Sequence, residues 1–555
     1  MENNKIVRDF NHTLLWPVQL RSLRREAGMD VVHYWDILRR SPGPWRYVED
    51  ALLIEDASCK IGYEEFVYFL PYVQRFLYGV GDEGRGAQSS LHIFTREDIA
   101  RIRVQLQPER EFISLRVDRV RLYFFYDIDV ALVAFEVAAS DLPLEDAIEI
   151  MDRLGRPYPP SWESNGQGSH CPHRVEMLAA DGSVLAQSDY DDYRKFLELV
   201  RQGRQTPLAT HWEFLLAPLV PAYKDESGAI KYYQLENKRI PIMSYLSFDD
   251  PHQLSRGDMV RLGFAAKWGP SDTLPYSSGF LQNFESDYCY DRYWEAQHGT
   301  NDSMHTRYFF CGVSFAMITR VDQAHAVLSR QFRHQFFQIG LIAHFHKAAL
   351  LSLSNRFSRA VERLNVRDFE SVNRFKRSVR ETLEVFLRFN HRYWFHELSN
   401  QVQASDFFKR WSHQLGSDAL YNEVREEARD INEYLDADRT RKQADNAMRL
   451  TVVSACGMVG TIVTGFLGMN LYSHADLPTL TKFMIFFAAF VPTTVLALYT
   501  VILSRRIAAF MEALSSEGLT WGEKFKTFRQ IWAADKRAFA RARRSNTGLS
   551  SGEDG

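Results

Sequence analysis

The sequence predicts an α+β membrane protein with a cytosolic α/β domain, a long helical stalk and a two-helix transmembrane hairpin. Two apolar runs near the C-terminal end of the chain, residues 450–470 and 483–504, contain no charged side chain. A charged stretch without glycine or proline leads into the first run, and segments rich in β-branched and aromatic residues occur within residues 50–319. Runs of about 20 apolar residues cross a bilayer as helices, whereas the β-branched segments are typical of strands.

The composition of the 555 residues leaves ample material for a large soluble part. The formal net charge is only −3, so the overall charge points to no nucleic-acid partner. The five cysteines are widely spaced, and Cys456 lies in an apolar run, so we expect no disulfide framework and a reducing cytosol. Residues 1–30 have no unbroken apolar core of the signal-peptide type, and we expect the N-terminus to stay in the cytoplasm.

Six segments follow from these patterns. We expect a cytosolic α/β domain with long insertions (1–319), a helical cytosolic region (320–416), the stalk and first span (417–470), an outer loop (471–482), the second span (483–504) and a basic cytoplasmic tail (505–555).

The strands of the α/β domain are expected where β-branched and aromatic residues gather. Asp127-Ile128-Asp129 is expected to form a turn between two of them, and Asp141 to cap a helix that has Pro143 in its first turn. Loops dense in glycine, proline and serine then indicate long insertions. The expected strands cover residues 112–117, 120–126, 130–137, 242–248 and 308–318.

Two clusters in this domain have ligand-like residues, and the sequence favours a plain loop for each. Residues 79–84 match the nucleotide-binding GxGxxG pattern, but an acidic pair stands where a pyrophosphate would lie. His170, Cys171 and His173 offer zinc ligands, but a fourth ligand at suitable spacing is missing from the sequence nearby. We therefore predict neither a nucleotide site nor a zinc site there, and no enzymatic arrangement stands out.

Residues 320–416 read as helical. The apolar run at 339–353 is short for a span and carries His344, His346 and Lys347, so it predicts a buried core helix. Two histidines that lie two positions apart on a helix face different ways, and we interpret them as packing or surface residues.

The stalk begins after the break at Gly416. Because neither glycine nor proline occurs between Ser417 and Cys456, the soluble helix continues into the first span. At 1.5 Å per residue, residues 417–468 extend on the order of 75 Å, far more than a bilayer needs. Carboxylates alternate with arginines along it. We interpret them as a solvated face with i to i+4 ion pairs, and divalent binding between subunits stays open as the alternative for Glu423, Glu426, Glu427, Asp430, Glu433, Asp436 and Asp438.

The first span has a narrow face and a bulky face. Small or flexible residues recur at helical spacing on the narrow face, namely Ser454, Gly457, Met458, Thr461, Gly465 and Gly468. Bulky β-branched and aromatic residues take the other side. The spacing leaves two interpretations open, close packing of helices in lipid and the lining of a pore formed by several copies.

The end of this span carries a family resemblance. Gly468-Met469-Asn470 resembles the signature of the CorA-type magnesium channel family, which stands at the outer end of the first of two C-terminal spans. Upstream positions match the family pattern too, namely Leu450, Thr451, Val452, Val453, Met458 and Thr461. The chain departs from that pattern at Val459, where proline is common, and at Leu467, where an aromatic residue is usual. The resemblance implies a funnel-like homopentamer with a cytosolic α/β domain, and regulatory divalent ions at subunit contacts.

The flanking charges predict the orientation. Basic residues precede the first span and follow the second, whereas the loop between them has Lys482 and Asp476. We therefore expect both termini in the cytoplasm and the protein in a cell membrane of the bacterial inner-membrane type. The tail interleaves aromatic and basic residues, which fits either anionic lipid headgroups or packing beside the stalk.

Magnesium chemistry suggests the roles of the pore residues. Mg²⁺ gives up water reluctantly, so a fast pore should hold the hydrated ion with neutral oxygens, as Asn470 side chains and Gly468 carbonyls would. Asp476 at the mouth would concentrate cations, and Thr461 would contact the hydration shell. Leu450 and Met458 would form apolar constrictions. We expect no cofactor, with hydrated divalent cations, lipids and further copies of the chain as partners.

Two other functions stay open. A Zn²⁺ transporter on the same scaffold is the nearer one, although the family's zinc branch commonly has isoleucine in place of Met469. A membrane-tethered sensor or enzyme would use the hairpin only as an anchor, and an anchor needs no polar stripe ending in Gly-Met-Asn.

Overall fold

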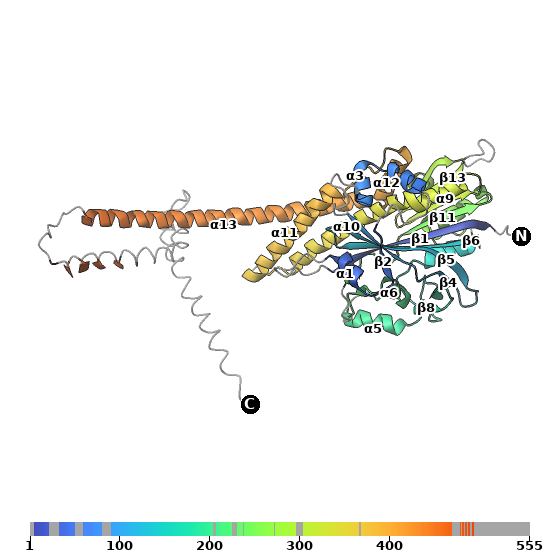
Figure 1. Cartoon of the computed structure of the whole chain (residues 1–555), viewed down its shortest axis with the longest axis horizontal. Coiled ribbons are helices and arrows are strands. Elements are labelled where there is room, and N and C mark those ends of the chain that lie inside the picture. The colour runs from blue at the N-terminus through green and yellow to red at the C-terminus, as the bar shows by residue number, and fades with distance from the viewer. Residues whose placement is uncertain are drawn as a thin grey trace, which may run out of the picture. The chain divides into compact units, whose positions relative to one another are not determined.

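The computed structural model describes most of the first 468 residues, and Figure 1 shows the chain. The described residues are 5–21, 33–49, 59–79, 90–203, 207–224, 230–236, 238–270, 272–295, 304–365, 368–468, 478 and isolated positions between 480 and 495. The chain divides into two compact units, Met1–Ala428 and Arg429–Gly555.

A sheet with 14 strands among the described residues forms the centre of the first unit, and its main path runs β12-β13-β14-β11-β1-β6-β5-β4-β7-β8. Neighbours are antiparallel except for the parallel pairs β11–β14 and β9–β10. The strands are β1 (Ile6–Leu20), β2 (Trp45–Tyr47), β3 (Leu91–Arg96), β4 (Arg101–Gln105), β5 (Ile113–Phe125), β6 (Val130–Pro143), β7 (Arg174–Leu178), β8 (Val184–Gln187), β9 (Val220–Pro221), β10 (Lys231–Gln234), β11 (Ile242–Phe248), β12 (Cys289–Trp294), β13 (His305–Cys311) and β14 (Ser314–Arg320).

Helices cover both faces of this sheet. They are α1 (Tyr34–Arg40), α2 (Cys59–Tyr68), α3 (Pro71–Tyr78), α4 (Leu144–Arg153), α5 (Tyr193–Gly203), α6 (Thr210–Leu216), α7 (Arg256–Phe264), α8 (Phe284–Tyr288), α9 (His325–Gln331), α10 (Phe337–Glu362), α11 (Phe369–Arg392), α12 (Val402–Leu415) and α13 (Ser417–Gly468). A π-helical turn, Phe332–Phe336, joins α9 to α10, and short 3₁₀ turns occur at Pro251–Gln253 and Phe280–Asn283.

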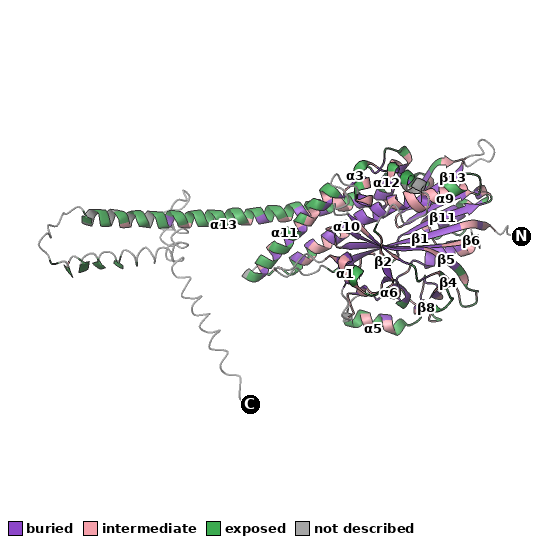
Figure 2. Cartoon of the chain, in the orientation of Figure 1, coloured by how far each residue is buried: buried purple, intermediate pink, exposed green. Residues whose placement is uncertain are grey.

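Alternation along β5 shows how the two faces divide. Tyr123 and Phe125 contact Phe337 and Phe345 of α10, and the Phe125 and Phe345 rings stack with centroids 3.9 Å apart. The intervening residues, such as Phe124, belong to the core on the opposite face, which also holds α4, α6 and α7. Successive strand residues point to opposite faces, so β5 supplies both layers, and Figure 2 shows the sheet and α10 as mainly buried.

The central strand β1 is one of several strands that sequence reasoning missed, and the others are β2, β3, β4, β7, β8, β9, β10 and β12. Strand β1 pairs with β6 on one side and with β11 on the other, and nearly all of it is buried. Several of its buried positions are polar and have dedicated partners: Asn11 donates to Glu136 (2.6 Å), and His12 Nδ1 lies 2.8 Å from Ser244 Oγ. These polar residues interrupt the apolar pattern that would have revealed a central strand.

Two expected strand boundaries differ from the structure. Residues 112–117 and 120–126 form one strand, β5, with a register shift between Val117 and Arg119. Residues 308–318 are two strands, β13 and β14, joined at Gly312, whose φ of +65° suits a residue without a Cβ.

The turn at 127–129 forms as predicted, but the predicted cap at Asp141 is wrong. Asp141 lies within β6 at a φ of 52° and pairs with Arg8. Pro143 is the N-cap of α4 and makes no side-chain cap bond. The strand β6 continues six residues beyond the expected end at residue 137, because Ile6 of β1 still pairs opposite Pro143.

A buried carboxylate joins the sheet to the helices. Glu136 accepts hydrogen bonds from Asn11, Arg119 and Arg333, and Arg333 lies in the π-helical turn. Burial would raise the pKa of Glu136, but the charges of the two arginines hold it at about 2. This carboxylate therefore stays ionised and fixes the π-helical turn against β6.

The apolar helix α10 is a core helix, as predicted. His344 and His346 are both buried, so the surface alternative for these histidines is wrong. Among the described helices, the stretch His325–Glu362 is long and apolar enough to cross a bilayer, yet 83% of its apolar window is buried within the protein. Because α10 packs on β1 and β6, the regions expected at 1–319 and 320–416 lie in one compact unit.

The prediction of a long helix is confirmed, since α13 continues without interruption from Ser417 to Gly468. The boundary between the units falls inside this helix, after Ala428. Val424 and Ala428 are buried, so the first three turns of α13 belong to the core of the first unit. The helix α13 begins at Ser417, but the second unit begins about three turns later, at Arg429.

Candidate ion-conducting segment

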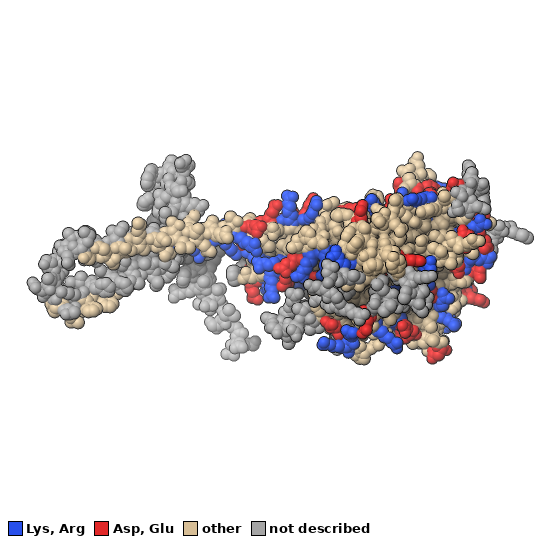
Figure 3. All heavy atoms as spheres, turned by 45° about the horizontal axis from the view of Figure 1, so that its top comes forward, with Lys and Arg blue, Asp and Glu red and all other residues tan. Residues whose placement is uncertain are grey.

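The apolar part of α13 presents its narrow face to open space. Figure 3 shows this part of the helix without charged side chains. Leu450 and Met458 are 67% and 69% exposed, and Ser454, Thr461 and the three glycines are exposed as well. A Cβ added at Gly457, Gly465 or Gly468 would meet no described heavy atom within 4 Å. The narrow face is thus available to other helices or to water. On the bulky face, Val452 is 4% exposed and Val453 is 40% exposed.

The threonine hydroxyls along this segment are oriented by the helix itself. Thr461 Oγ1 donates to the Gly457 carbonyl (2.9 Å), and Thr464 Oγ1 donates to the Gly460 carbonyl (2.9 Å). The hydroxyl hydrogen is therefore committed to the backbone, and the oxygen lone pairs remain as acceptors. Water molecules around a cation direct their hydrogens outward, so an exposed acceptor such as Thr461 Oγ1 suits the hydration shell of a cation.

The continuously described part of the chain ends at the outer end of this segment. Gly468 is the last residue of α13. Met469, Asn470 and Asp476 lie outside the described residues, as do the tail at 505–555 and most of residues 471–504. The roles expected for these residues stay predictions.

Ion pairs occupy the charged part of α13. Arg429 Nε donates to Glu433 Oε1 (3.0 Å), and Lys442 Nζ lies 3.4 Å from Asp438 Oδ2. Asp436 pairs with Arg439 three positions later (3.3 Å). All these pairs have i to i+3 or i to i+4 spacing, which supports the interpretation of a solvated helix face.

Glu427 differs from these paired carboxylates because it lies within the first unit and faces α10. Its Oε1 lies 3.5 Å from Ser354 Oγ of α10, and burial together with Glu423 raises its pKa. Among the described residues, no three histidine, cysteine or carboxylate side chains are placed to hold a metal ion together.

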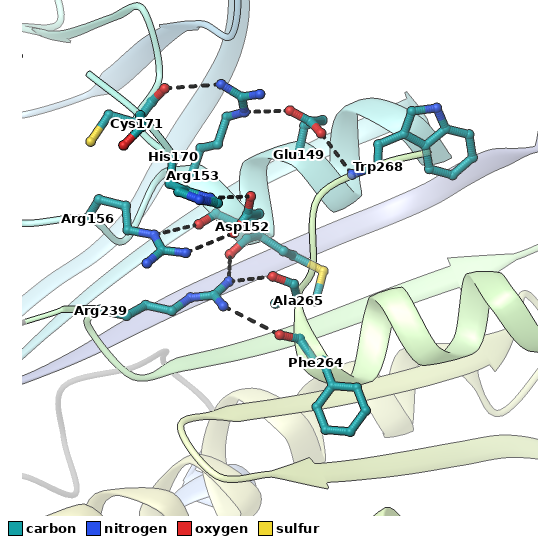
Figure 4. A network of polar contacts seen from close by, with 12 residues as sticks. Glu149, Asp152, Arg153, Arg156, His170, Cys171, Arg239, Phe264, Ala265 and Trp268 are labelled. Carbon is teal, nitrogen blue, oxygen red and sulfur yellow. Dashed lines mark hydrogen bonds and ion pairs between the residues drawn. The ribbon is translucent and has the colours of Figure 1, made fainter. Parts of the chain in front are cut away.

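The loop with His170, Cys171 and His173 belongs to a polar network around the end of α4 (Figure 4). Burial raises the pKa of the Cys171 thiol to about 12, so it stays protonated and is a poor metal ligand. The Cys171 carbonyl accepts a hydrogen bond from Arg153, which also donates to Glu149.

The rest of this network ties the insertion loops to α4 and α7. Glu149 accepts from the Trp268 backbone (2.8 Å), and Arg156 donates to Asp152 (2.9 Å). Arg239 donates to backbone carbonyls, among them that of Ala265 (2.9 Å), and burial lowers its pKa to about 10. These charged groups bind each other and backbone carbonyls, so the network has a structural role. No periodic pattern in the sequence indicates it.

The glycine cluster at 79–84 begins with a helix end. Gly79 caps α3 at a φ of 69°, and its N–H bonds to the Arg75 carbonyl (3.1 Å). This is a C-terminal αL cap, which agrees with the turn interpretation for Gly79. Gly81 and Gly84 lie outside the described residues.

One comparison with known proteins finds a relationship. The model of the family described as "CorA-like Mg2+ transporter protein" matches residues 360–506, which include α11, α12, α13 and the second apolar run. Searches of curated proteins and of solved structures gave no significant match.

Proposed function

We propose that the chain belongs to the CorA-like Mg²⁺ transporter family, whose model matches residues 360–506, and that it is a Mg²⁺ channel whose pore is lined by α13. The family is one of membrane-embedded transporters of divalent cations, and the channel, its ion and its assembly are the parts that we propose. The observation that carries the proposal is a continuous helix whose uncharged narrow face, exposed in one copy, leads to Gly468.

Several copies are needed to enclose the path. One chain has two apolar runs of spanning length, and two helices cannot surround a pore. Glycines at 457, 465 and 468, where an added Cβ would meet open space, allow neighbouring copies of α13 to approach a common axis. We propose a homopentamer, with both termini in the cytoplasm and the second run facing lipid.

The proposed selectivity follows from the donor set. Gly468 carbonyls, the Asn470 side chains and Thr461 Oγ1 are neutral oxygens, and neutral oxygens can hold Mg²⁺ together with its water. A ring of carboxylates at the same level would bind the ion more tightly and slow its release. Asp476 at the outer mouth would concentrate cations, and no resident cofactor is required.

The filter is tested by Asn470→Ala. The substitution removes the amide oxygens of the proposed ring, so Mg²⁺ uptake into liposomes that contain the purified protein and a Mg²⁺-sensitive dye should fall to background. The matched control is Asn422→Ala, an exposed asparagine on the charged part of α13, which should conduct like the wild type. If Asn470→Ala takes up Mg²⁺ as fast as Asn422→Ala and the wild type, and its oligomers are unchanged on size-exclusion chromatography, the proposed filter is refuted.

The same vesicles decide between Mg²⁺ and Zn²⁺. With a dye for each ion, the wild type is expected to carry Mg²⁺ at rates at least about tenfold above Zn²⁺ at equal concentration. A preference for Zn²⁺ would assign the chain to the alternative transport function, and it would leave the pore assignment intact.

A further inference from the structure

Strands β5, β4, β7 and β8 form one end of the sheet, and their side chains divide it into a buried face and an exposed face (Figure 1). Along β4, Ile102 and Val104 belong to the core, whereas Arg101 is exposed and Arg103 is half-buried. Because successive strand residues point to opposite faces, the two arginines lie on the same side, about 7 Å apart along the strand. The side opposite the core is therefore polar and open to solvent.

Arginines from the neighbouring strands complete this exposed side. In the antiparallel pairing, Arg116 of β5 lies directly opposite Arg101, and Glu176 of β7 lies opposite Arg103. The buried Glu176 pairs with two arginines, since Arg103 Nε donates to its Oε2 (3.0 Å) and Arg174 Nε lies 2.8 Å from its Oε1. We call Arg101, Arg103, Arg116 and Arg174 the arginine face.

The described carboxylates leave the arginine face positively charged. Arg116 Nη2 donates to Asp118 Oδ2 (3.1 Å), which is two residues farther along β5. Among the residues that the structure describes, no carboxylate pairs with Arg101. Four arginines thus lie beside two carboxylates, Glu176 and Asp118, and the local net charge is +2. This local excess stands out in a chain whose formal net charge is −3.

The Arg101–Arg116 pair is unfavourable for the sheet itself. Directly opposite residues on antiparallel strands have Cβ atoms about 5 Å apart, and like charges at such positions repel. Natural proteins keep arrangements of this kind mainly where a function needs them. A bound anion would neutralise both charges, so the pair suits the recognition of an acidic partner.

The shape of the arginine face favours an extended polypeptide. An extended chain repeats its side chains about 7 Å apart on one side, so carboxylates at alternate positions match the spacing of Arg101 and Arg103. Guanidinium groups bind carboxylates through two parallel hydrogen bonds. In the same row, Leu178 of β7 lies opposite Arg101, and Val184 of the edge strand β8 lies opposite Leu178. Val184 is 50% exposed and offers an apolar contact beside the charges.

Nucleic acid fits the arginine face less well. Single strands bind to aromatic rings on which the bases stack. The exposed aromatic ring beside this face, Phe112, is already occupied by the Arg103 guanidinium, which lies 5.2 Å from the ring centroid.

Lipid headgroups fit it less well too. The first turns of α13, the helix that leads to the apolar run, lie near the opposite end of β5, where Tyr393 donates to the Tyr126 carbonyl and the neighbouring Trp394 stacks on Tyr421.

We propose that the arginine face is a docking site for an extended acidic segment of another protein, with aspartate or glutamate at alternate positions. Carboxylates of the segment neutralise Arg101 and Arg116 and relieve their repulsion. The first unit thereby recruits a partner through a surface that is separate from the ion path, and the proposal does not depend on the ion that the chain transports.

Binding is measured by fluorescence anisotropy on the full-length protein in detergent micelles at low ionic strength. The probe is the labelled peptide Glu-Ser-Glu-Val-Glu-Ser-Glu, and the comparison is a peptide of the same composition whose glutamates are adjacent. The alternating peptide should bind about threefold or more tightly than the comparison, because it places all its carboxylates on one side. Added salt should weaken the binding.

Variants connect this binding to the arginine face. Arg101→Gln and Arg116→Gln should each weaken binding of the alternating peptide about threefold or more, and the double variant should lose the preference between the peptides. Because Arg101→Gln also removes a like-charge contact, it should raise the denaturation midpoint of the free protein. The matched control is Lys409→Gln, an exposed cation on α12, which should change neither binding nor the midpoint.

Equal binding of the two peptides by the wild type, or wild-type binding by the double variant, would overturn the proposal. A lower midpoint for Arg101→Gln together with unchanged binding would make Arg101 a structural residue and would also overturn it. Unlabelled inorganic triphosphate and an oligouridylate serve as competitors. If either displaces the probe at a lower concentration than the unlabelled peptide does, the arginine face binds phosphate, and the acidic protein partner is refuted.

Discussion

Gly340 lies where α10 passes close to Trp411 of α12 and Met243 of β11. An added Cβ would be 2.6 Å from Trp411 Cη2 and 3.0 Å from Met243 Sδ, with side chains fixed by burial around it. Overpacking of this kind costs about 1–3 kcal/mol and outweighs the helix propensity of alanine. Gly340→Ala should therefore lower the midpoint of chemical denaturation, and Ser358→Ala, exposed on the same helix, should not. If Gly340→Ala has the same denaturation midpoint as the wild type, α10 can shift away from Trp411 and Met243 at little cost.

Leu450 and Met458 carry the second prediction at the scale of single residues. Both are exposed on the narrow face, where an apolar side chain would exclude water from a closed pore. Changing either to serine should wet the constriction and raise leak current in planar-bilayer recordings. Val453→Ser provides the control, because Val453 lies on the bulky face of the same helix. Leak that rises with Val453→Ser as much as with the other two would indicate general damage to the span instead of a gate.

At the scale of elements, sequence reasoning succeeded where one pattern dominates an element. The long helix α13 followed from the absence of glycine and proline, and the buried α10 followed from an apolar run with histidines. It failed for β1, whose buried polar residues are satisfied by partners far away in the chain, such as Gln19 by Ser352. It also failed at Asp141, since the length of β6 is set by pairing with β1 and not by the local cap signal.

The candidate site shows the same difference between local sequence patterns and contacts made by tertiary packing. The narrow face could be read from the spacing along one helix, because such a face is a local property. The contacts at the C-terminal end of α11, from Arg388 to Asp127 and from Trp394 to Tyr421, could not be found in this way. They form only by tertiary packing, and no short-range spacing connects a strand turn to two helices.

At the scale of the whole molecule, the buried histidines predict an acid-sensitive fold. His12, His211, His344 and His346 are buried, and burial lowers the pKa of each to about 3. In the unfolded chain a histidine has a pKa of about 6.5, so between these values the unfolded chain binds protons that the folded chain does not. The free energy of unfolding should therefore fall as the pH drops below about 6.5, by up to about 1.4 kcal/mol per pH unit for each histidine.

The measurement is the denaturation midpoint of the full-length protein at pH 7.5 and at pH 5.5. A lower midpoint at pH 5.5 is expected. Glu136 adds to the loss only at lower pH, because its stabilising ionisation is present above the ordinary carboxyl pKa and is lost as the pH falls toward about 2. A midpoint that stays constant or rises at pH 5.5 would contradict the burial of neutral histidines.

The position of β1 at the centre of the sheet imposes an order on synthesis. The ribosome makes β1 before the other strands of the described sheet. Both edges of β1 are paired only after Ala139 of β6 and then Leu246 of β11, the partners of Phe10, have been made. Pairing across such long separations is slow, and an unpaired strand in a nascent chain is prone to join other chains. All strands of the described sheet precede α13 in the chain, so the sheet has its full set of partners before the apolar run at 450–470 is made. A ribosome that stalls before residue 242 would therefore leave the middle strand of the sheet half paired and exposed to aggregation.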